Sequence, residues 1–184
     1  VLRQMRCPSR YFLGRGYDRD TLIRHEVGDW VGQEGPLQGR AVVPLWDEHH
    51  RRVVGLSARS PHPRCPDCRL FHHPFADCPD ERSRRLPSLA KWYNEGLRGD
   101  ALLYNYWFAA PHVRASRLAV VVEGPGDVWR LEEAGVFNAV ALFGNELHDA
   151  QQVVLERSGA LSVLGLPHAD QAGELDESLY SMVD

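Results

Sequence analysis

The second half of the chain, from about residue 101, alternates short apolar runs with segments of helical periodicity. Apolar runs bounded by turn residues predict buried strands, and the periodic segments between them predict helices. The expected strands lie at 118–122, 138–143 and 160–166, and the expected helices at 128–134 and 147–157. Continuous apolar strands separated by helices are typical of a parallel sheet that is covered on both faces. The predicted fold class of this half is therefore α/β.

The first half shows a different pattern. Asp18 precedes a helical segment containing Leu22 and Ile23, so we expect it to cap a helix that Gly28 ends. Residues 41–46 and 52–57 read as β-rich runs around the polar "DEHH", and this arrangement predicts a hairpin. An α+β lobe before the α/β region follows from these elements.

Residues 61–90 are rich in Pro, Cys, His and Arg and have no periodicity, which indicates an inserted loop or a small metal module. The stretch "CPDCRLFHHPFADC" offers three thiols and an imidazole with Cys-x2-Cys-x4-His-x4-Cys spacing, typical of a zinc knuckle: Cys65, Cys68, His73 and Cys78. Four such ligands fill the tetrahedron of a structural Zn²⁺. His72 is an alternative to His73, and three incidental thiols in a loop are the alternative to zinc. Cys7 stands apart as a free thiol.

Overall composition narrows the class of protein. The 184 residues carry a net charge of −4, so bulk charge does not indicate nucleic acid, although the arginines cluster before residue 25 and at 82–85. An exposed, solvated arginine surface explains those clusters equally well. Without an apolar stretch of membrane-spanning length we expect no membrane partner. The first ten residues lack the apolar core of a signal peptide, which favours a cytoplasmic location.

Two carboxylates flank the glycine turn of "VEGPGD". Glu123 comes directly after a predicted parallel strand, where α/β proteins bind ligands, and Gly124 and Gly126 allow Asp127 to face the same side. Paired carboxylates suit divalent-metal binding or acid–base catalysis. The alternative is a turn in which Asp127 caps a helix. Asp170 follows the last predicted strand in the same way, with an ordinary loop as its alternative.

Several separated motifs together resemble the catalytic core of DnaG-type bacterial primases, whose centre is a TOPRIM domain. "FLGRGYDRDTLIRHEVG" is similar to the opening element of that family, and "GRAVVPLWDEHHRRVVGLSARS" to its hairpin. "KWYNE" and "LLYNYWFA" stand where the family has two further short elements. "VVVEGPGDVWRLEEAGVFNAVALFGNELHDAQ" then follows the TOPRIM pattern, so the resemblance covers about residues 10–173.

The resemblance implies a TOPRIM-like parallel sheet flanked by helices and preceded by an α+β lobe. The implied domains are a primase-like lobe at 10–110, with a zinc-knuckle insert at 61–85, and a TOPRIM-like domain at 111–184. The insert is not part of the ordinary bacterial pattern. The chain ends soon after the last motif, so we expect the domain to be incomplete at its C-terminus, and we expect no counterpart of the family's N-terminal zinc ribbon.

The resemblance also implies roles for individual residues. Glu123 and Asp170 would hold catalytic Mg²⁺ or Mn²⁺, with Asp127 and Lys91 completing the catalytic group. Nucleotide or template binding is implied for four residues: Arg40, Arg59, Asn94 and Gly144. His168 stands where the family has the first aspartate of an Asp-x-Asp pair, and imidazole suits Mn²⁺ better than Mg²⁺.

The implied function is a DNA primase-like nucleotidyltransferase that makes RNA primers on a single-stranded DNA template. Its partners would be the template and NTPs, with a replicative helicase as a further candidate. Because His168 replaces an acid, a catalytically impaired TOPRIM module that binds nucleic acid is the first alternative. A metal-dependent nuclease is the second, since TOPRIM carboxylates also serve phosphodiester cleavage.

Overall fold

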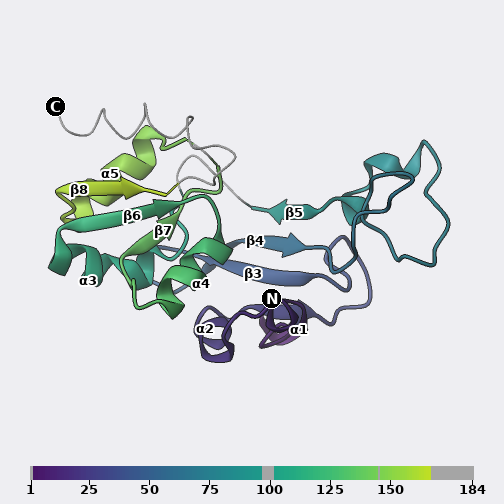
Figure 1. Ribbon diagram of the computed structural model, residues 1–184, viewed down its shortest axis with the longest axis horizontal. Helices are drawn as coiled ribbons and strands as arrows, with labels where there is room; N and C mark the ends of the chain where they lie inside the picture. The colour runs from purple at the N-terminus through teal and green to yellow at the C-terminus, as the bar shows by residue number, and fades with distance from the viewer. Residues whose placement is uncertain (1, 97–101, 145, 167–184) are drawn as a thin grey trace. The chain divides into compact units, whose positions relative to one another are not determined.

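The computed structural model describes residues 2–96, 102–144 and 146–166. Residues 1–45 and 55–96 form one compact unit, and residues 46–54 group with the C-terminal part of the chain in a second. The turn of the central hairpin and the first residues of its second strand thus belong to the second unit, whereas the rest of both strands lies mainly in the first. Each unit has its own sheet (Figure 1).

The first unit is built on a five-stranded sheet with strand order β1-β2-β3-β4-β5. The strands are β1 (Met5–Arg6), β2 (Gly28–Trp30), β3 (Ala41–Trp46), β4 (Val53–Arg59) and β5 (Trp92–Glu95). The helices are α1 (Arg10–Gly14) and α2 (Arg19–Arg24), with short 3-10 turns η1 (Leu2–Gln4), η2 (Ser83–Arg85) and η3 (Pro87–Leu89). The predicted hairpin is present as β3 and β4. The whole stretch between β4 and β5 is loop and 3-10 turn, as the lack of periodicity indicated.

Helix α2 begins as predicted, because the Asp18 carboxylate accepts hydrogen bonds from the amides of Asp20 and Thr21. It ends at Arg24, four residues before the predicted end. The chain reverses at Glu26, which has a φ of 54°, and Gly28 already belongs to β2. A Cβ at Gly28 would lie 2.9 Å from the carbonyl oxygen of Arg6, so this strand pairing requires glycine. The glycine therefore serves the sheet and not the helix end.

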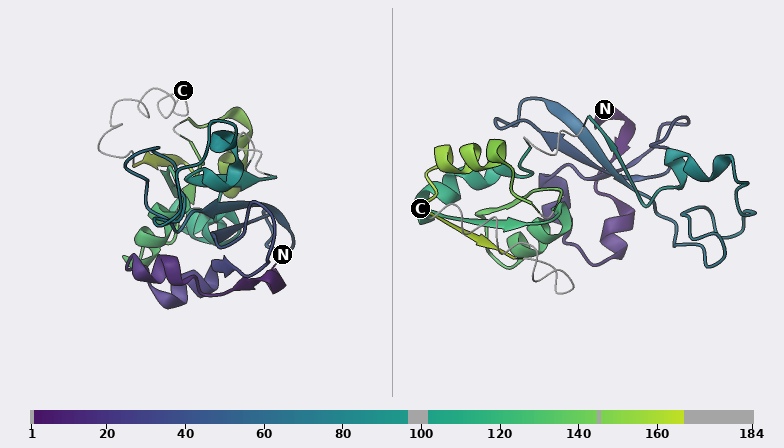
Figure 2. Two further views of the ribbon diagram at one scale, coloured as in Figure 1. Left: turned by 90° about the vertical axis from the view of Figure 1, so that its right-hand side faces the viewer. Right: turned by 90° about the horizontal axis from the view of Figure 1, so that it is seen from above.

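The second unit contains a three-stranded parallel sheet with strand order β7-β6-β8. Its strands are β6 (Leu118–Val122), β7 (Ala139–Ala141) and β8 (Ser162–Gly165), and its helices are α3 (Tyr106–Ser116), α4 (Pro125–Glu133) and α5 (Asp149–Ser158). Helices α3 and α5 contact each other on one face of the sheet, and α4 packs against β7 on the other (Figure 2). This arrangement confirms the predicted α/β class, a parallel sheet covered on both faces.

Apolar burial holds the second unit together. Val121, Val140 and Leu155 are fully buried in one cluster with residues of α3. Trp129 of α4 is also fully buried, and its indole N–H donates a 2.9 Å hydrogen bond to the Tyr104 hydroxyl. Burying an indole is favourable only when its N–H finds a partner, which Tyr104 supplies. Among the described residues, no helix has the length and apolar character needed to cross a bilayer.

Candidate functional site

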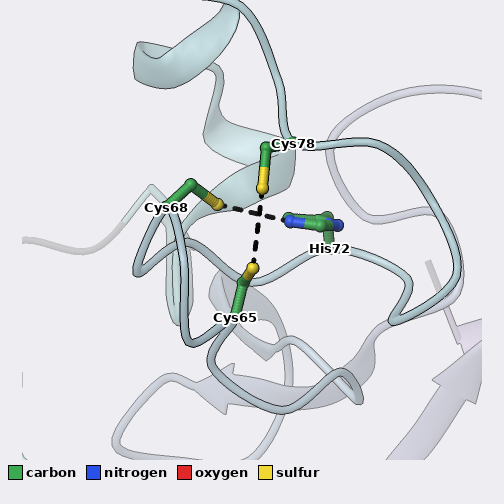
Figure 3. A group of neighbouring side chains, drawn as sticks. All are labelled: Cys65, Cys68, His72 and Cys78. Carbon is green, nitrogen blue, oxygen red and sulfur yellow. Dashed lines mark hydrogen bonds between the residues drawn. The ribbon is translucent and has the colours of Figure 1, made fainter.

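The loop between β4 and β5 brings four metal-binding side chains together: Cys65, Cys68, His72 and Cys78 (Figure 3). Their ligand atoms all lie within 4.8 Å of one another. The Sγ atoms of Cys65 and Cys78 are 3.8 Å apart, and Sγ of Cys68 is 3.3 Å from Nε2 of His72. A tetrahedron with Zn–S bonds of about 2.3 Å has S···S edges of about 3.8 Å, so the group fits Zn²⁺.

The histidine in this group is His72, and not His73, which the knuckle spacing favoured. Nδ1 of His72 donates a 2.9 Å hydrogen bond to the His73 carbonyl, and this turns Nε2 toward Cys68. Such a bond from the second ring nitrogen to a backbone carbonyl is common in histidines that bind metal. The His73 ring instead accepts a bond from the Phe75 amide and contacts His62. The ligand spacing is thus x2, x3 and x5, which departs from the zinc-knuckle pattern.

Hydrogen bonding within the loop favours the thiolate form of Cys65. The backbone amide of Cys68, followed by that of Asp67, donates to Sγ of Cys65 and lowers the pKa of Cys65 to about 6. Hydrogen bonds with the sulfur atoms of Cys65 and Cys68 favour the protonated form of Cys78 and raise its pKa to about 11. Because zinc binds cysteines as thiolates, metal binding releases the protons that these thiols still carry. Cys7 is a free thiol outside this group.

In the second unit, Glu123 follows β6 directly and is half-buried at the carboxyl end of the central strand. The next residues start α4, in which Asp127 is the third residue. The Oδ2 atom of Asp127 accepts a 3.2 Å hydrogen bond from the Gly124 amide, so this carboxylate caps the helix. The helix-cap alternative for Asp127 is thus present in the structure. Gly144 follows β7 at the same end of the sheet, with open space where a Cβ would be.

The other carboxylate expected at this edge, Asp170, and the neighbouring His168 lie outside the described residues. Among the residues that the structure describes, the thiol–imidazole group is the only set of three or more His, Cys, Asp or Glu side chains close enough to hold an ion. Of the residues implied to hold Mg²⁺ or Mn²⁺, the structure therefore describes Glu123, which lies at the carboxyl end of β6 as predicted.

In the first unit, two residues implied in nucleotide or template binding lie on the neighbouring strands β4 and β5, and Lys91 of the implied catalytic group comes just before β5. Arg59 pairs in register with Trp92, and Asn94 pairs with Ser57. The Ser57 hydroxyl donates a 2.8 Å hydrogen bond to Oδ1 of Asn94. Lys91 is exposed just before β5, and its carbonyl accepts a bond from Ser60. The strand pairing therefore brings Arg59, Lys91 and Asn94 to one edge of the sheet.

Arg40 is also implied in nucleotide or template binding, but it is buried and hydrogen-bonded within the first unit. Its side chain is only 2% exposed, and burial lowers the pKa of its guanidinium. One nitrogen donates to the Ala58 carbonyl, and the other donates to carbonyls of η3 and its flank: Pro87, Ser88 and Ala90. The guanidinium thus fastens the end of the loop to β4. We assign Arg40 to the fold because its donors are used within the unit.

Three aromatic rings that the sequence did not single out surround Arg59: Tyr11, Phe71 and Trp92. They come from α1, the metal-binding loop and β5, which lie far apart in the chain. No periodicity links them, so no sequence signal predicts that they meet. Their meeting depends on the pairing of β4 with β5 and on the path of the loop.

Comparison with known proteins agrees with this architecture. The Toprim domain family model matches residues 117–175, the region of the three-stranded sheet. None of the curated proteins compared with the chain matches it significantly.

Solved primase structures match much more of the chain. The Aquifex aeolicus primase (zinc-binding and RNA polymerase domains) is 18% identical, with a TM-score of 0.68 over 94% of this chain and 45% of that one. The RNA polymerase domain of Mycobacterium tuberculosis DnaG is 19% identical, with a TM-score of 0.66 over 89% of this chain and 59% of that one. The DnaG catalytic domain bound to ssDNA is 18% identical, with a TM-score of 0.60 and coverages of 94% and 56%.

These findings define the class of protein: residues 117–175 match the Toprim domain model, and the chain has the fold of DnaG-type primase catalytic cores. It spans about half the length of the solved primase chains that it matches. The resemblance stated from the motifs is therefore confirmed at the level of the fold.

Proposed function

We propose that this chain acts as a primase-type nucleotidyltransferase that synthesises RNA primers on single-stranded DNA. The observation that carries the proposal is the position of Glu123, directly after the central strand of a Toprim sheet in a primase-core fold. Parallel sheets bind ligands at the carboxyl ends of their strands, so the position of Glu123 supports a role for it in the reaction.

The proposed roles follow the chemistry of phosphoryl transfer, which needs a metal and cationic groups to receive phosphate charge. Glu123 and Asp170 would hold Mg²⁺ or Mn²⁺, with His168 favouring Mn²⁺. The bound cation would lower the cost of the charge that develops on the transferred phosphate. Lys91 and Arg59 would receive nucleotide or template phosphates, and Asn94 and Gly144 would each contribute to nucleotide or template binding in their own unit. Zn²⁺ on the cysteine loop would be structural, because four protein ligands leave no open position.

Primer synthesis on a single-stranded template with NTPs tests the proposal. We expect labelled primers with Mn²⁺ and fewer with Mg²⁺, and Glu123→Gln should reduce product at least 100-fold, since it removes a metal-binding charge. Glu156→Gln is the matched control, because this glutamate is exposed on α5. Equal primer yields from wild type and Glu123→Gln would contradict the role assigned to this residue.

A second candidate is a Toprim module that binds nucleic acid without catalysis, and the replacement of an acidic residue by His168 favours it. In that case wild-type protein binds oligonucleotides but makes no primers. His168→Asp distinguishes a disabled site from an absent one, because restoring the carboxylate would restore Mg²⁺-dependent synthesis only if the rest of the site is intact.

A further inference from the structure

Arg59 is surrounded by aromatic rings at the edge of the first unit. Its guanidinium carbon lies 5.3 Å from the ring centroid of Phe71, 5.7 Å from that of Tyr11 and 5.8 Å from that of Trp92. These distances are within the range of cation–π attraction. The rings remain accessible: Trp92 is 39% exposed, and Tyr11 and Phe71 are half-buried.

The charge of Arg59 is not neutralised by an acid. Within the described residues it makes no ion pair, and one of its guanidinium nitrogens donates hydrogen bonds to the carbonyls of Ser60 and Lys91. A second guanidinium, that of Arg15, lies 5.9 Å from the Tyr11 ring centroid. An arginine stays protonated at physiological pH, so the site presents positive charge framed by flat apolar surfaces.

The third ring of this site belongs to the metal-binding loop. Phe71 directly precedes His72 and is three residues after Cys68, so two of the four metal ligands flank it. Its amide donates to the Leu89 carbonyl, and the Leu70 carbonyl accepts from the Cys65 amide. The position of the Phe71 ring therefore depends on residues 65–72, the segment that carries three of the four candidate metal ligands.

We propose that Arg59 and the rings of Tyr11, Phe71 and Trp92 form a single-stranded DNA site, to which the zinc loop contributes Phe71. The guanidinium binds a backbone phosphate and the exposed ring surfaces stack unpaired bases, the combination by which proteins hold single strands without reading sequence. The choice of DNA as the ligand rests on the proposed function. The role of the loop in this site rests on the contacts around Arg59 alone.

The binding of a fluorescent oligo(dT) strand to the full chain, followed by anisotropy without NTPs, tests this site. Phe71→Ala should weaken binding roughly fivefold to tenfold through loss of stacking, and Phe71→Tyr should stay within about twofold of wild type because the ring is kept. Phe75→Ala is the matched control: this ring lies in the same loop and is 92% exposed, but it does not contact Arg59. The control should also bind within about twofold of wild type.

Zinc removal provides the second arm. Chelation should weaken wild-type binding by about the same factor as Phe71→Ala and should add little to that variant, since both act on one ring. A strand of the same length with abasic residues should bind wild type and Phe71→Ala equally, because it has no bases to stack. Circular dichroism of each variant checks that the fold is kept.

Three outcomes would overturn the proposal: no oligo(dT) binding by wild type, equal binding by Phe71→Ala and wild type, or a larger loss from Phe75→Ala than from Phe71→Ala. A preference for blunt duplex over single strands would also overturn it, because duplex bases are not free to stack on protein rings. None of these readouts requires primer synthesis. An inactive polymerase that still shows the Phe71 effect would therefore reject the proposed function alone, and an active one without the effect would reject this site alone.

Discussion

The metal-binding loop and the Toprim sheet are ordered by different means. None of residues 61–90 is buried, and Phe75 and Leu86 expose 92% and 52% of their surface. In the sheet and in helix α5, which packs on it, Val121, Val140 and Leu155 are by contrast completely buried. Apolar burial contributes about 25 cal/mol per Å², so the sheet can hold itself together, whereas the loop buries too little to offset the entropy of ordering it.

The loop also has little regular hydrogen bonding. Its only secondary structure is two 3-10 turns near its end, η2 and η3, and its four metal ligands lie in the part that precedes them. Small segments that cannot build a core are commonly held by a metal or by disulfides. The four cysteines form no disulfide, so we expect a metal bound by Cys65, Cys68, His72 and Cys78 to order this loop.

Zinc removal should therefore have the largest effect and should be confined to the loop. Binding of structural Zn²⁺ contributes on the order of 10–16 kcal/mol in small zinc modules, so its loss should leave residues 65–78 without order. Hydrogen-exchange mass spectrometry before and after chelation should show lost protection there, with β6 and α4 unchanged.

Cys7→Ser is the matched control for this experiment, because Cys7 lies outside the ligand group. It should keep full zinc content and protection, whereas Cys68→Ser should reproduce chelation. A loop that keeps its protection without zinc would show that the contrast between the two regions is wrong.

Trp129→Ala should have the next largest effect. It should destabilise the second unit and leave the metal-binding loop unchanged. Trp129 is fully buried, and truncating a buried tryptophan costs about 3–5 kcal/mol in the free energy of unfolding. Urea denaturation would measure this loss, and metal analysis should still find one equivalent of zinc, since the ligands lie in the first unit. Leu161→Ala, at a site 78% exposed, should change stability by less than about 0.5 kcal/mol. Loss of zinc from Trp129→Ala would contradict independent ordering.

The elements that apolar burial orders were the ones the sequence could predict. The apolar runs located β6, β7 and β8 to within a few residues, and Asp18 marked the start of α2. Helix α3 was not predicted, because it starts after a left-handed Asn105 and contains a proline, so its sequence lacks the usual signals.

At the candidate site, the sequence predicted the residue types better than their roles. Spacing indicated a Cys3His group but favoured His73, since the bond that orients His72 goes to a backbone carbonyl, which no motif records. Asp127 was open between a catalytic carboxylate and a cap, and the decision depends on its 3.2 Å contact with the Gly124 amide. Contacts between residues distant in the chain, such as Phe71 with Arg59, leave no local pattern at all.

Arg40 connects the metal-binding loop to the sheet of the first unit, because its guanidinium binds the end of the loop to β4. Its guanidinium donates to four carbonyls, three of them from the loop end at 87–90. A lysine ammonium is a single point with three donors and cannot span these acceptors. Arg40→Lys should therefore lower the free energy of unfolding by about 2–3 kcal/mol, measured by urea denaturation, with a smaller effect on zinc affinity.

Arg51→Lys is the control for this substitution, because Arg51 is exposed in the hairpin turn, and it should be neutral within about 0.5 kcal/mol. If Arg40 contacted the template instead, Arg40→Lys would leave stability unchanged and weaken oligonucleotide binding. A loss of stability with oligonucleotide binding retained would show that this guanidinium orders residues 87–90. The chelation experiment would show in the same way that the metal orders residues 65–78. The loop would then be held at its centre by zinc and at its base by one buried cation.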